Sequence, residues 1–443
     1  MKRVLFVSYV FPPMAAVGGR RVVDFCKYLP RHGWEPVVLT VKGGTNASWD
    51  ESQLKKIPDT KIYRSATFEP LLKDAAKGAR PQKVYRPETG PVNTAMPTER
   101  LTPWKKFKKA VRTFLRVPDE NNFWVPMGIR TGMKAIRHER IDAIVSSSPP
   151  VSAHLLASIL SRLSGKPHIA DFRDLWTLNH TYQYRGFSER LKRYDAFWER
   201  WMLKHAAGVT VATTGFERQM KGHLGGLIAD RVSTITNGFD YEEIDSEQEF
   251  PPTPGDKFRI LYTGSLYSDF NPVFFLESVA QWLEDRGVDS NTIGIDFYGH
   301  CEYDYTDWLK SLGLGETVRF HGFRPQAELA TAFQQADCLL LLLSFKPQHS
   351  NVIPAKLFEY LAAPPPILAL APQGTTADLI GRHEGGVVIT EPEKERMFAI
   401  LDELYQAWQH KPATIRKYRY IRDIDRNHLA GSLAGELDRV TAV

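Results

Sequence analysis

A lysine and a glutamate three residues apart, Lys356 and Glu359, could bind a phosphorylated sugar. They follow an apolar run, Leu339–Leu343, that predicts a buried strand. Three-residue spacing places both side chains on one helix face, and Pro354 suits the first helical turn. In parallel α/β sheets, ligands bind at the carboxyl ends of strands, where helix N-termini attract phosphate. We therefore expect a cation for phosphate and a carboxylate for sugar hydroxyls here. The alternative is an ordinary amphipathic helix whose Lys and Glu face solvent.

The surrounding segment supports a family resemblance. Residues 350–370 read SNVIPAKLFEYLAAPPPILAL, which resembles the E-x7-E region of family-four, retaining glycosyltransferases with the GT-B fold. The form P-A-K-L-F-E-Y-L-A resembles a branch that builds bacterial surface polysaccharides. The resemblance implies that Glu359 holds the ribose of a nucleotide-sugar. Asn351 stands where the family has its first Glu, so that position can hydrogen-bond but carries no charge.

Two further turns in the second half extend the resemblance. Relatives carry an Arg and a Lys after the strand that ends at Gly264-Ser265, but residues 264–272 contain neither. The diphosphate would then be held by Lys356, Arg324, backbone N–H groups or a glycine loop. The turn His321–Arg324 resembles the family's base-contacting turn. The donor-binding residues implied are Gly18, Gly19, Gly264, Ser265, Phe323, Arg324, Asn351, Ile353, Lys356, Leu357 and Glu359.

The first half begins with a strand, residues 2–9, a loop containing Gly18-Gly19, and a helix, residues 20–31. The glycines allow close backbone approach to an anionic ligand. They do not form G-x-G-x-x-G, so no dinucleotide site is indicated. The alternative is a turn that needs positive φ. In the family, this loop faces the donor phosphates.

Three residues of the first half are candidate catalytic groups. The string D-F-R-D-L-W at residues 171–176 resembles the D-x-R-D-x-W segment of the same branch. Asp171 and Arg173 would be cleft residues for the acceptor or for domain closure. Alternatively, Arg173 pairs with an Asp and braces the loop. His154 lies within a predicted helix, residues 151–163, where a catalytic role competes with a structural one.

Composition favours a globular protein of two or three domains. The chain has 443 residues, 43% of them hydrophobic and 24% charged, with a formal charge of +6. The three cysteines form no disulfide or metal pattern, and we expect neither a metal nor a cofactor apart from the donor. The N-terminus reads as a strand, not a signal peptide, and a cytoplasmic protein is expected.

One basic segment predicts contact with a membrane. Residues 101–116 place Trp and Phe at helical spacing among six Lys and Arg, with no acid. A helix of this kind binds an anionic membrane surface. The alternative is a helix packed on its own domain with a solvated Lys face. Nucleic acid is disfavoured, because the aromatic residues follow the apolar stripe and form no stacking platform.

Strands alternate with helices through both halves, which favours an α/β fold with two doubly wound parallel sheets. The resemblance implies GT-B architecture, with Rossmann-like domains facing across a cleft. We expect an acceptor-side domain at residues 1–240, with an insertion at about 69–116, and a linker at 241–256. A donor domain at 257–410 and C-terminal helices at 411–443, crossing back to the first domain, complete the organisation.

The resemblance implies transfer of a sugar from a nucleotide-diphosphate sugar, of the UDP or GDP type. Retention of configuration and independence of metal are implied as well. The acceptor would be a glycan or a lipid-linked sugar at the inner face of the cytoplasmic membrane. Two alternatives stay open: a nucleotide-sugar epimerase on the same fold, and a non-catalytic GT-B assembly partner. Fold alone does not choose among them.

Overall fold

The first strand, β1 (Lys2–Val7), is buried on both faces. In the computed structural model, Val4 and Phe6 join one apolar cluster, whereas Leu5 and Val7 join another. None of the four is more than 1% exposed. Strands covered on both faces are typical of parallel sheets flanked by helices.

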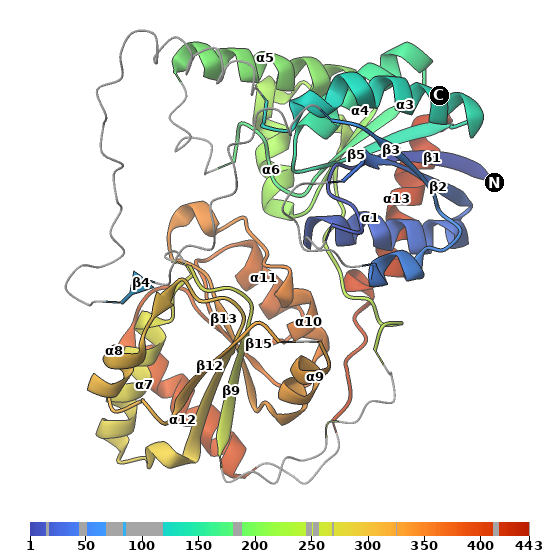
Figure 1. Cartoon of the computed structure of the whole chain (residues 1–443). Coiled ribbons are helices and arrows are strands. Elements are labelled where there is room, and N and C mark those ends of the chain that lie inside the picture. The colour runs from blue at the N-terminus through green and yellow to red at the C-terminus, as the bar shows by residue number, and fades with distance from the viewer. Residues whose placement is uncertain are drawn as a thin grey trace. The chain divides into compact units, whose positions relative to one another are not determined.

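The structure describes residues 1–14, 17–43, 51–67, 83–85, 118–179, 188–244, 250, 257–267, 270–324, 326–410 and 416–442. Contacts divide the chain into two units (Figure 1). Unit 1 comprises Met1–Lys77, Pro97–Asp240 and Arg422–Val443. Unit 2 comprises Gly78–Met96 and Tyr241–Ile421. The helical segment predicted at residues 101–116 lies outside the described residues.

Unit 1 is built on a seven-stranded sheet in the order β3-β2-β1-β5-β6-β7-β8. Every neighbouring pair is parallel. The other strands are β2 (Trp34–Val41), β3 (Lys61–Ser65), β5 (Ala143–Ser148), β6 (His168–Phe172), β7 (Gly208–Val211) and β8 (Val232–Thr234). The chain turns in opposite directions from β1 and from β5, so a topological switch point lies between them.

Helices cover both faces of this sheet (Figure 1). On one face α1 (Val17–Tyr28) packs with α13 (Arg426–Thr441), and both share an apolar cluster with β1. The other face carries α3 (Val125–His138) and α4 (Ser152–Ser164). Farther along the sheet, α5 (Glu189–His205) and α6 (Thr214–Gly222) enclose a third cluster. The C-terminal helix therefore completes the core of the unit that begins at the N-terminus.

Unit 2 contains a six-stranded parallel sheet in the order β12-β10-β9-β13-β14-β15. Its strands are β9 (Phe258–Thr263), β10 (Ile293–Tyr298), β12 (Val318–Gly322), β13 (Cys338–Leu342), β14 (Ile367–Leu370) and β15 (Gly386–Ile389). One face is covered by α7 (Val273–Arg286), α8 (Thr306–Ser311) and α12 (Lys394–Gln409) (Figure 1). The other face carries α9 (Gln326–Gln335), α10 (Lys356–Ala362) and α11 (Thr375–Arg382) (Figure 1).

A short piece of the predicted insertion joins unit 2. Strand β4 (Lys83–Val84) pairs with β11 (Tyr303–Asp304). Tyr85 follows, and its ring centroid lies 4.9 Å from that of Tyr305 and 5.0 Å from that of Trp308. This aromatic contact explains why three residues of a Pro- and Lys-rich stretch belong to the second sheet domain.

The predicted fold class is confirmed: both units are parallel α/β sheets with helices on each face. Strand β3 was not predicted. Helix α1 begins at Val17, so Gly18 and Gly19 lie in its first turn and not in a loop. Among the described residues, no helix has both the length and the apolar character that a membrane crossing requires.

Candidate functional site

The loops of unit 2 meet where its sheet changes direction. Strands β9 and β13 are neighbours, but β9 leads to β10 on one side and β13 leads to β14 on the other. In open α/β sheets a ligand crevice forms at the carboxyl ends of such strands. The loop after β13 contains the segment that first suggested a donor site.

Lys356, the first residue of α10, reaches across to β9. Its Nζ lies 3.6 Å from the centroid of the Tyr262 ring. Burial lowers the pKa of Lys356 to about 7, because a desolvated ammonium ion is disfavoured. Among the described residues, no carboxylate pairs with this ammonium. The position is therefore suited to an anion that the protein itself does not supply.

Glycines bring the surrounding loops close together. Gly264 has φ +115° and Gly299 has φ +131°, in the region that favours glycine. The Gly264 N–H donates to the carbonyl oxygen of Tyr298 at 2.7 Å. A Cβ on Gly299 would overlap the Gly264 carbonyl, and one on Gly264 would lie 2.7 Å from Lys356 Nζ. Side chains at these positions would crowd the crevice.

The loop before α10 is held by the start of α11. The Thr375 N–H donates to the Ser350 carbonyl at 2.7 Å, and the Thr376 hydroxyl donates to the Val352 carbonyl at 2.6 Å. A Cβ on Gly374 would overlap the Ser350 carbonyl. These contacts fix the path of the residues that precede Lys356.

The other predicted residues of the motif differ in their surroundings. Glu359, Asn351 and Ile353 are half-buried, and Glu359 lies on the first turn of α10, three residues after Lys356. Leu357 is fully buried, and its N–H donates to the Pro354 carbonyl at 3.0 Å. Leu357 therefore packs in the core, and its predicted donor contact has no support in this geometry.

The predicted base-contacting turn follows β12. Phe323 is 91% exposed, and Arg324 donates from Nε to the His321 carbonyl at 3.0 Å. His321 in turn lies 2.7 Å from the Asp296 carboxylate and stacks on Tyr298. Because β12 is two strands from β9, this turn begins about 10 Å from the Lys356 crevice. Half-buried Ser265 follows Gly264, and its carbonyl accepts from the Tyr262 hydroxyl at 3.1 Å.

In unit 1, Asp171 belongs to a buried ion pair with Arg21. Arg21 donates from Nε and Nη2 to the two carboxylate oxygens, at 3.0 and 2.8 Å. Thr210 and Ser147 also donate to this carboxylate. Burial alone would raise the Asp171 pKa, but the Arg21 charge and these hydrogen bonds outweigh it and lower the pKa. Asp171 therefore braces strand ends through Arg21. The alternative in which Arg173 pairs with an Asp differs from this arrangement, because Arg173 donates to backbone carbonyls.

Arg173 instead ties three backbone segments together. Its guanidinium donates to the Ser148 carbonyl at 2.8 Å, to the Pro149 carbonyl at 2.6 Å and to the Gly18 carbonyl. A Cβ on Gly18 would overlap the guanidinium. Gly18 and Gly19 are not among the described glycines with positive φ, so the alternative of a turn that needs positive φ is wrong, whereas the close approach of an anionic ligand to Gly18 stays a prediction. Its missing side chain makes room for Arg173.

His154 is fully buried. Its Nδ1 lies 2.6 Å from the Ser146 hydroxyl, and its Nε2 lies 2.8 Å from the Ser148 hydroxyl. The Ser146 hydroxyl also lies 2.7 Å from Nε2 of His168. Burial lowers the pKa of both histidines to about 3. This network favours a structural role over the predicted catalytic one.

The start of α4 is likewise occupied by the protein itself. The Ser152 N–H donates to the Asp119 carboxylate at 2.7 Å. A helix N-terminus with a bound carboxylate has no unsatisfied attraction for an external anion. Within the described part of unit 1, the groups at the carboxyl ends of β5 and β6 mainly hold one another in place.

Sequence reasoning missed Arg21 and Tyr262. Arg21 shares the apolar face of α1 with Phe25, one turn later, and its guanidinium lies 4.9 Å from the Phe25 ring centroid. A cation on an apolar helix face is the signal that could have identified it. Tyr262 offered no comparable signal, because an aromatic residue is ordinary in a strand.

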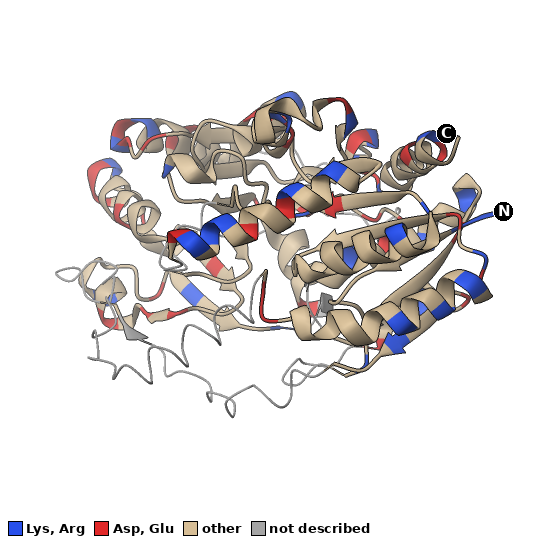
Figure 2. Cartoon of the chain, turned by 90° about the horizontal axis from the view of Figure 1, so that it is seen from above, with Lys and Arg blue, Asp and Glu red and all other residues tan. Residues whose placement is uncertain are grey.

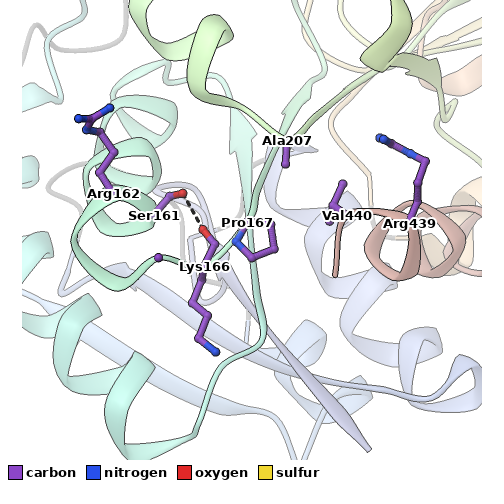
Figure 3. Close-up of a pocket in the computed structure, with 8 residues that line it drawn as sticks. Ser161, Arg162, Lys166, Pro167, Ala207, Arg439 and Val440 are labelled. Atoms are coloured by element: carbon purple, nitrogen blue, oxygen red, sulfur yellow. Dashed lines mark hydrogen bonds between the residues drawn. The ribbon is translucent and has the colours of Figure 1, made fainter. Parts of the chain in front are cut away.

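A cavity of about 620 Å³ lies at the opposite, amino edge of the unit 1 sheet. Pro167 and Ala207, which precede β6 and β7, line it (Figure 3). Its three cations, Arg162, Lys166 and Arg439, point in different directions (Figure 3). Arg439 also pairs with Glu436 at 2.7 Å. The cations do not converge on one point, so the cavity is not a built anion site.

Family models match nearly the whole chain. The model described as "Glycosyl transferase 4-like domain" matches residues 18–238, and "Glycosyl transferases group 1" matches residues 243–421. The chain belongs to the group 1, GT4-like glycosyltransferases. The predicted family and enzyme class are thereby confirmed.

Solved structures share the fold of this glycosyltransferase at low identity. Anabaena Alr3699/HepE in complex with UDP is 14% identical, with a TM-score of 0.54 and coverage of 100% of this chain and 98% of that one. Sucrose-phosphate synthase from Thermosynechococcus elongatus is 12% identical, with a TM-score of 0.54 and coverage of 100% and 97%. A putative UDP-N-acetylglucosamine 2-epimerase from Listeria monocytogenes is 12% identical, with a TM-score of 0.50 and coverage of 99% and 96%. A comparison with curated proteins finds no match.

Proposed function

We propose that this glycosyltransferase moves a sugar from a UDP- or GDP-type donor to a glycan or lipid-linked acceptor, in bacterial surface-polysaccharide synthesis. Transfer proceeds with retention and without a metal ion. The observation that carries the donor site is the ammonium of Lys356, held at the switch point of the unit 2 sheet and paired with no carboxylate among the described residues. The Anabaena HepE structures in complex with UDP and with UDP-glucose support a donor of the uridine type.

In this proposal the donor diphosphate lies over Gly264 and beside Lys356. As the bond between the sugar C1 and the diphosphate oxygen breaks, its electron pair passes to the leaving diphosphate. The acceptor hydroxyl oxygen bonds to C1 on the same face, and its proton passes to the diphosphate oxygen. A cation fixed at that oxygen stabilises the developing charge without reorganising. Because Gly264 and Gly299 have no side chains, the loops pack closely and the phosphates have room to approach the backbone beside Lys356.

The remaining donor contacts follow from the motif. Glu359, on the same helix face as Lys356, accepts hydrogen bonds from the ribose hydroxyls. Asn351 meets the transferred sugar as a neutral hydrogen-bonding group. Phe323 supplies an exposed ring on which the base stacks, and Arg324 lies beside it. The acceptor binds at the carboxyl edge of the unit 1 sheet, where Arg173 fixes three backbone segments.

A thermal-shift series with UDP-, GDP- and ADP-sugars tests the donor site. One donor is expected to raise the melting temperature, since a ligand that binds only the folded state stabilises it. Glu359→Ala is expected to remove this response while leaving the melting temperature without donor nearly unchanged. Glu395→Ala, an exposed change on α12, is the matched control and retains the response. An unchanged donor affinity in Glu359→Ala would exclude Glu359 from the site.

Product analysis distinguishes sugar transfer from epimerisation. The fold alone does not distinguish them, because the putative epimerase from Listeria shares it. A transferase releases free nucleoside diphosphate only when acceptor is present, and the glycosidic product keeps the anomeric configuration of the donor. Turnover should persist in the presence of a chelator. Conversion of the donor sugar without any acceptor would contradict the proposal.

A further inference from the structure

Helix α5 has buried acids on its inner face and exposed cations on its outer face. Its two central acids, Asp195 and Glu199, are fully buried. Asp195 accepts from the Trp176 indole at 3.0 Å, and Glu199 accepts from the backbone N–H and hydroxyl of Thr177. Because both carboxylates are used inside the protein, neither neutralises the cations on the outer face.

That outer face carries cations around an exposed ring. Phe197 is 58% exposed, and Arg193, Arg200 and Lys204 are exposed as well. Their spacing of four, three and four residues places them in one line along the helix. Blue Lys and Arg segments recur along α5 from its first turn to its last (Figure 2). An exposed acid, Glu189, occurs only in the first turn, where it pairs with Lys192 at 2.8 Å.

A row of aromatic side chains runs beside this line. The row comprises Tyr194, Trp198, Trp201 and His205, with successive ring centroids 6.2, 5.7 and 5.2 Å apart. Phe197 joins it, 5.6 Å from Trp198. None of these rings is fully buried. The rings of Tyr194, Phe197, Trp198 and Trp201 meet edge to face, so they form a continuous apolar ridge and not a platform for stacked bases.

The end of α4 extends this surface. The Arg162 guanidinium lies 5.9 Å from the Trp201 ring centroid, and the next residue, Leu163, is 59% exposed. Leu163 and Phe197 are thus large apolar side chains left in water on neighbouring helices of unit 1. We define the α5 ridge as Arg193, Phe197, Trp198, Arg200, Trp201 and Lys204.

We propose that the α5 ridge docks unit 1 on an anionic phospholipid bilayer. Aromatic rings with apolar bodies and polar edges favour the interfacial zone of a bilayer, and Lys or Arg beside them attract anionic headgroups. Charge complementarity selects this occupant, because the exposed central part of the helix has cations and no acid. The ridge shares no residue with the segment 101–116, and its docking does not rest on the donor chemistry proposed above.

Vesicle co-sedimentation of the full chain, without nucleotide-sugar, tests the inference. The protein should bind vesicles of phosphatidylcholine mixed with phosphatidylglycerol, and bind much less to phosphatidylcholine alone. Arg193→Glu/Arg200→Glu should weaken binding by about tenfold or more, since two cations that attract the anionic surface become acids that it repels. Phe197→Ser should weaken it as well. The matched control, Lys310→Glu/Arg396→Glu, reverses two exposed charges of unit 2 and should leave binding unchanged.

Two further measurements complete the test. All variants change exposed side chains, so their thermal unfolding should match that of the parent, which separates lost docking from lost folding. Light scattering reports whether the ridge joins two copies instead. The inference is overturned if the parent does not bind anionic vesicles, or if both ridge variants bind them as the parent does. It is also overturned if Phe197→Ser only converts a dimer to a monomer.

Discussion

At the residue scale, Lys356 combines a charge with surroundings that disfavour it. Its ammonium lies over the Tyr262 ring, and burial holds its pKa near 7. A cation–π contact recovers only about 0.5 to 2 kcal/mol, less than the burial of a charge usually costs. The side chain is therefore better suited to a complex with an anion than to the free protein.

Replacing Lys356 with Met should stabilise the free protein and abolish the donor response. Met keeps the apolar stem and removes the desolvated charge, so we expect a gain of at least about 1 kcal/mol at pH 6. The gain should shrink as the pH rises from about 7 toward 10.5, because the wild-type side chain then becomes neutral in the folded state. Thermal unfolding with and without donor measures both effects.

Lys310→Met, at an exposed position on α8, controls for the loss of a surface charge and should change neither property. A loss of stability in Lys356→Met at pH 6 would mean that the ammonium is stabilised in the free protein.

The same group predicts how donor binding depends on pH. With a free-state pKa of about 7, Lys356 is protonated below that pH and largely neutral above it. A bound diphosphate raises the pKa, so binding above pH 7 takes up a proton. Donor affinity should therefore fall as the pH rises from 7 to 9, by up to about tenfold per pH unit.

Calorimetry in two buffers of different ionisation enthalpy measures the proton uptake. The uptake should approach one proton near pH 8 and be near zero at pH 6. Equal affinities at pH 6.5 and pH 8.5 would contradict the assignment of Lys356 to the diphosphate.

At the element scale, the first turn of α1 is shaped by what lies against it. Gly18→Ala should be destabilising by about 1 to 3 kcal/mol, because its Cβ would push the Arg173 guanidinium away from the backbone carbonyls to which it donates. Gly19→Ala is the matched control in the same turn, since its Cβ would come no closer than 3.4 Å to any atom. Denaturant unfolding of both variants measures the difference.

Combining Gly18→Ala with Arg173→Ala tests the mechanism. If the clash causes the loss, the double variant should be less destabilised than the sum of the two single changes. Additive effects would indicate that Gly18 matters for another reason.

Most elements follow from the sequence, and the exceptions have physical reasons. The apolar runs of β1, β9 and β13 predict buried parallel strands, and the structure has them. Strand β3 escaped prediction because it is an edge strand with half-buried side chains. Strand β4 has two residues and exists through its pairing with β11 and the rings that Tyr85 meets. Contacts between residues so far apart in the chain leave no local pattern.

The same limit applies to the site. Residue types, spacing and the family resemblance pointed to Lys356 and Glu359 as donor-binding residues, and that role stays a prediction. The roles of Gly18 and Arg173 depend on three loops that converge, so the sequence indicated that these residues matter but not what they contact. His154 was uncertain because a histidine within a helix has the same pattern whether it faces a ligand or two serines.

At the scale of the whole molecule, two buried histidines should make folding sensitive to acid. His154 and His168 have pKa values of about 3 in the folded state, against about 6.5 when unfolded. Between these values the unfolded chain binds more protons than the folded chain. The contribution of the two histidines to the free energy of unfolding is therefore fully present above pH 6.5 and is lost as the pH falls. Each histidine contributes about 1.4 kcal/mol per pH unit within this window.

Denaturant unfolding of unit 1 between pH 7 and pH 5 measures this slope. His154→Gln and His168→Gln should each reduce it, whatever they do to stability at pH 7. His138→Gln, at an exposed position on α3, should leave it unchanged. An unaltered slope in both buried variants would assign the acid sensitivity to other groups.

The packing of α13 against α1 has a consequence for biosynthesis. Leu429, Leu433 and Leu437 fill the same apolar cluster as Val22 and Phe25, yet the ribosome makes them about four hundred residues later. Unit 2 has all its strands once Ile421 has emerged, whereas the first-made sheet must wait for the last helix to cover it. During synthesis, unit 1 is therefore started first but its core is completed after that of unit 2.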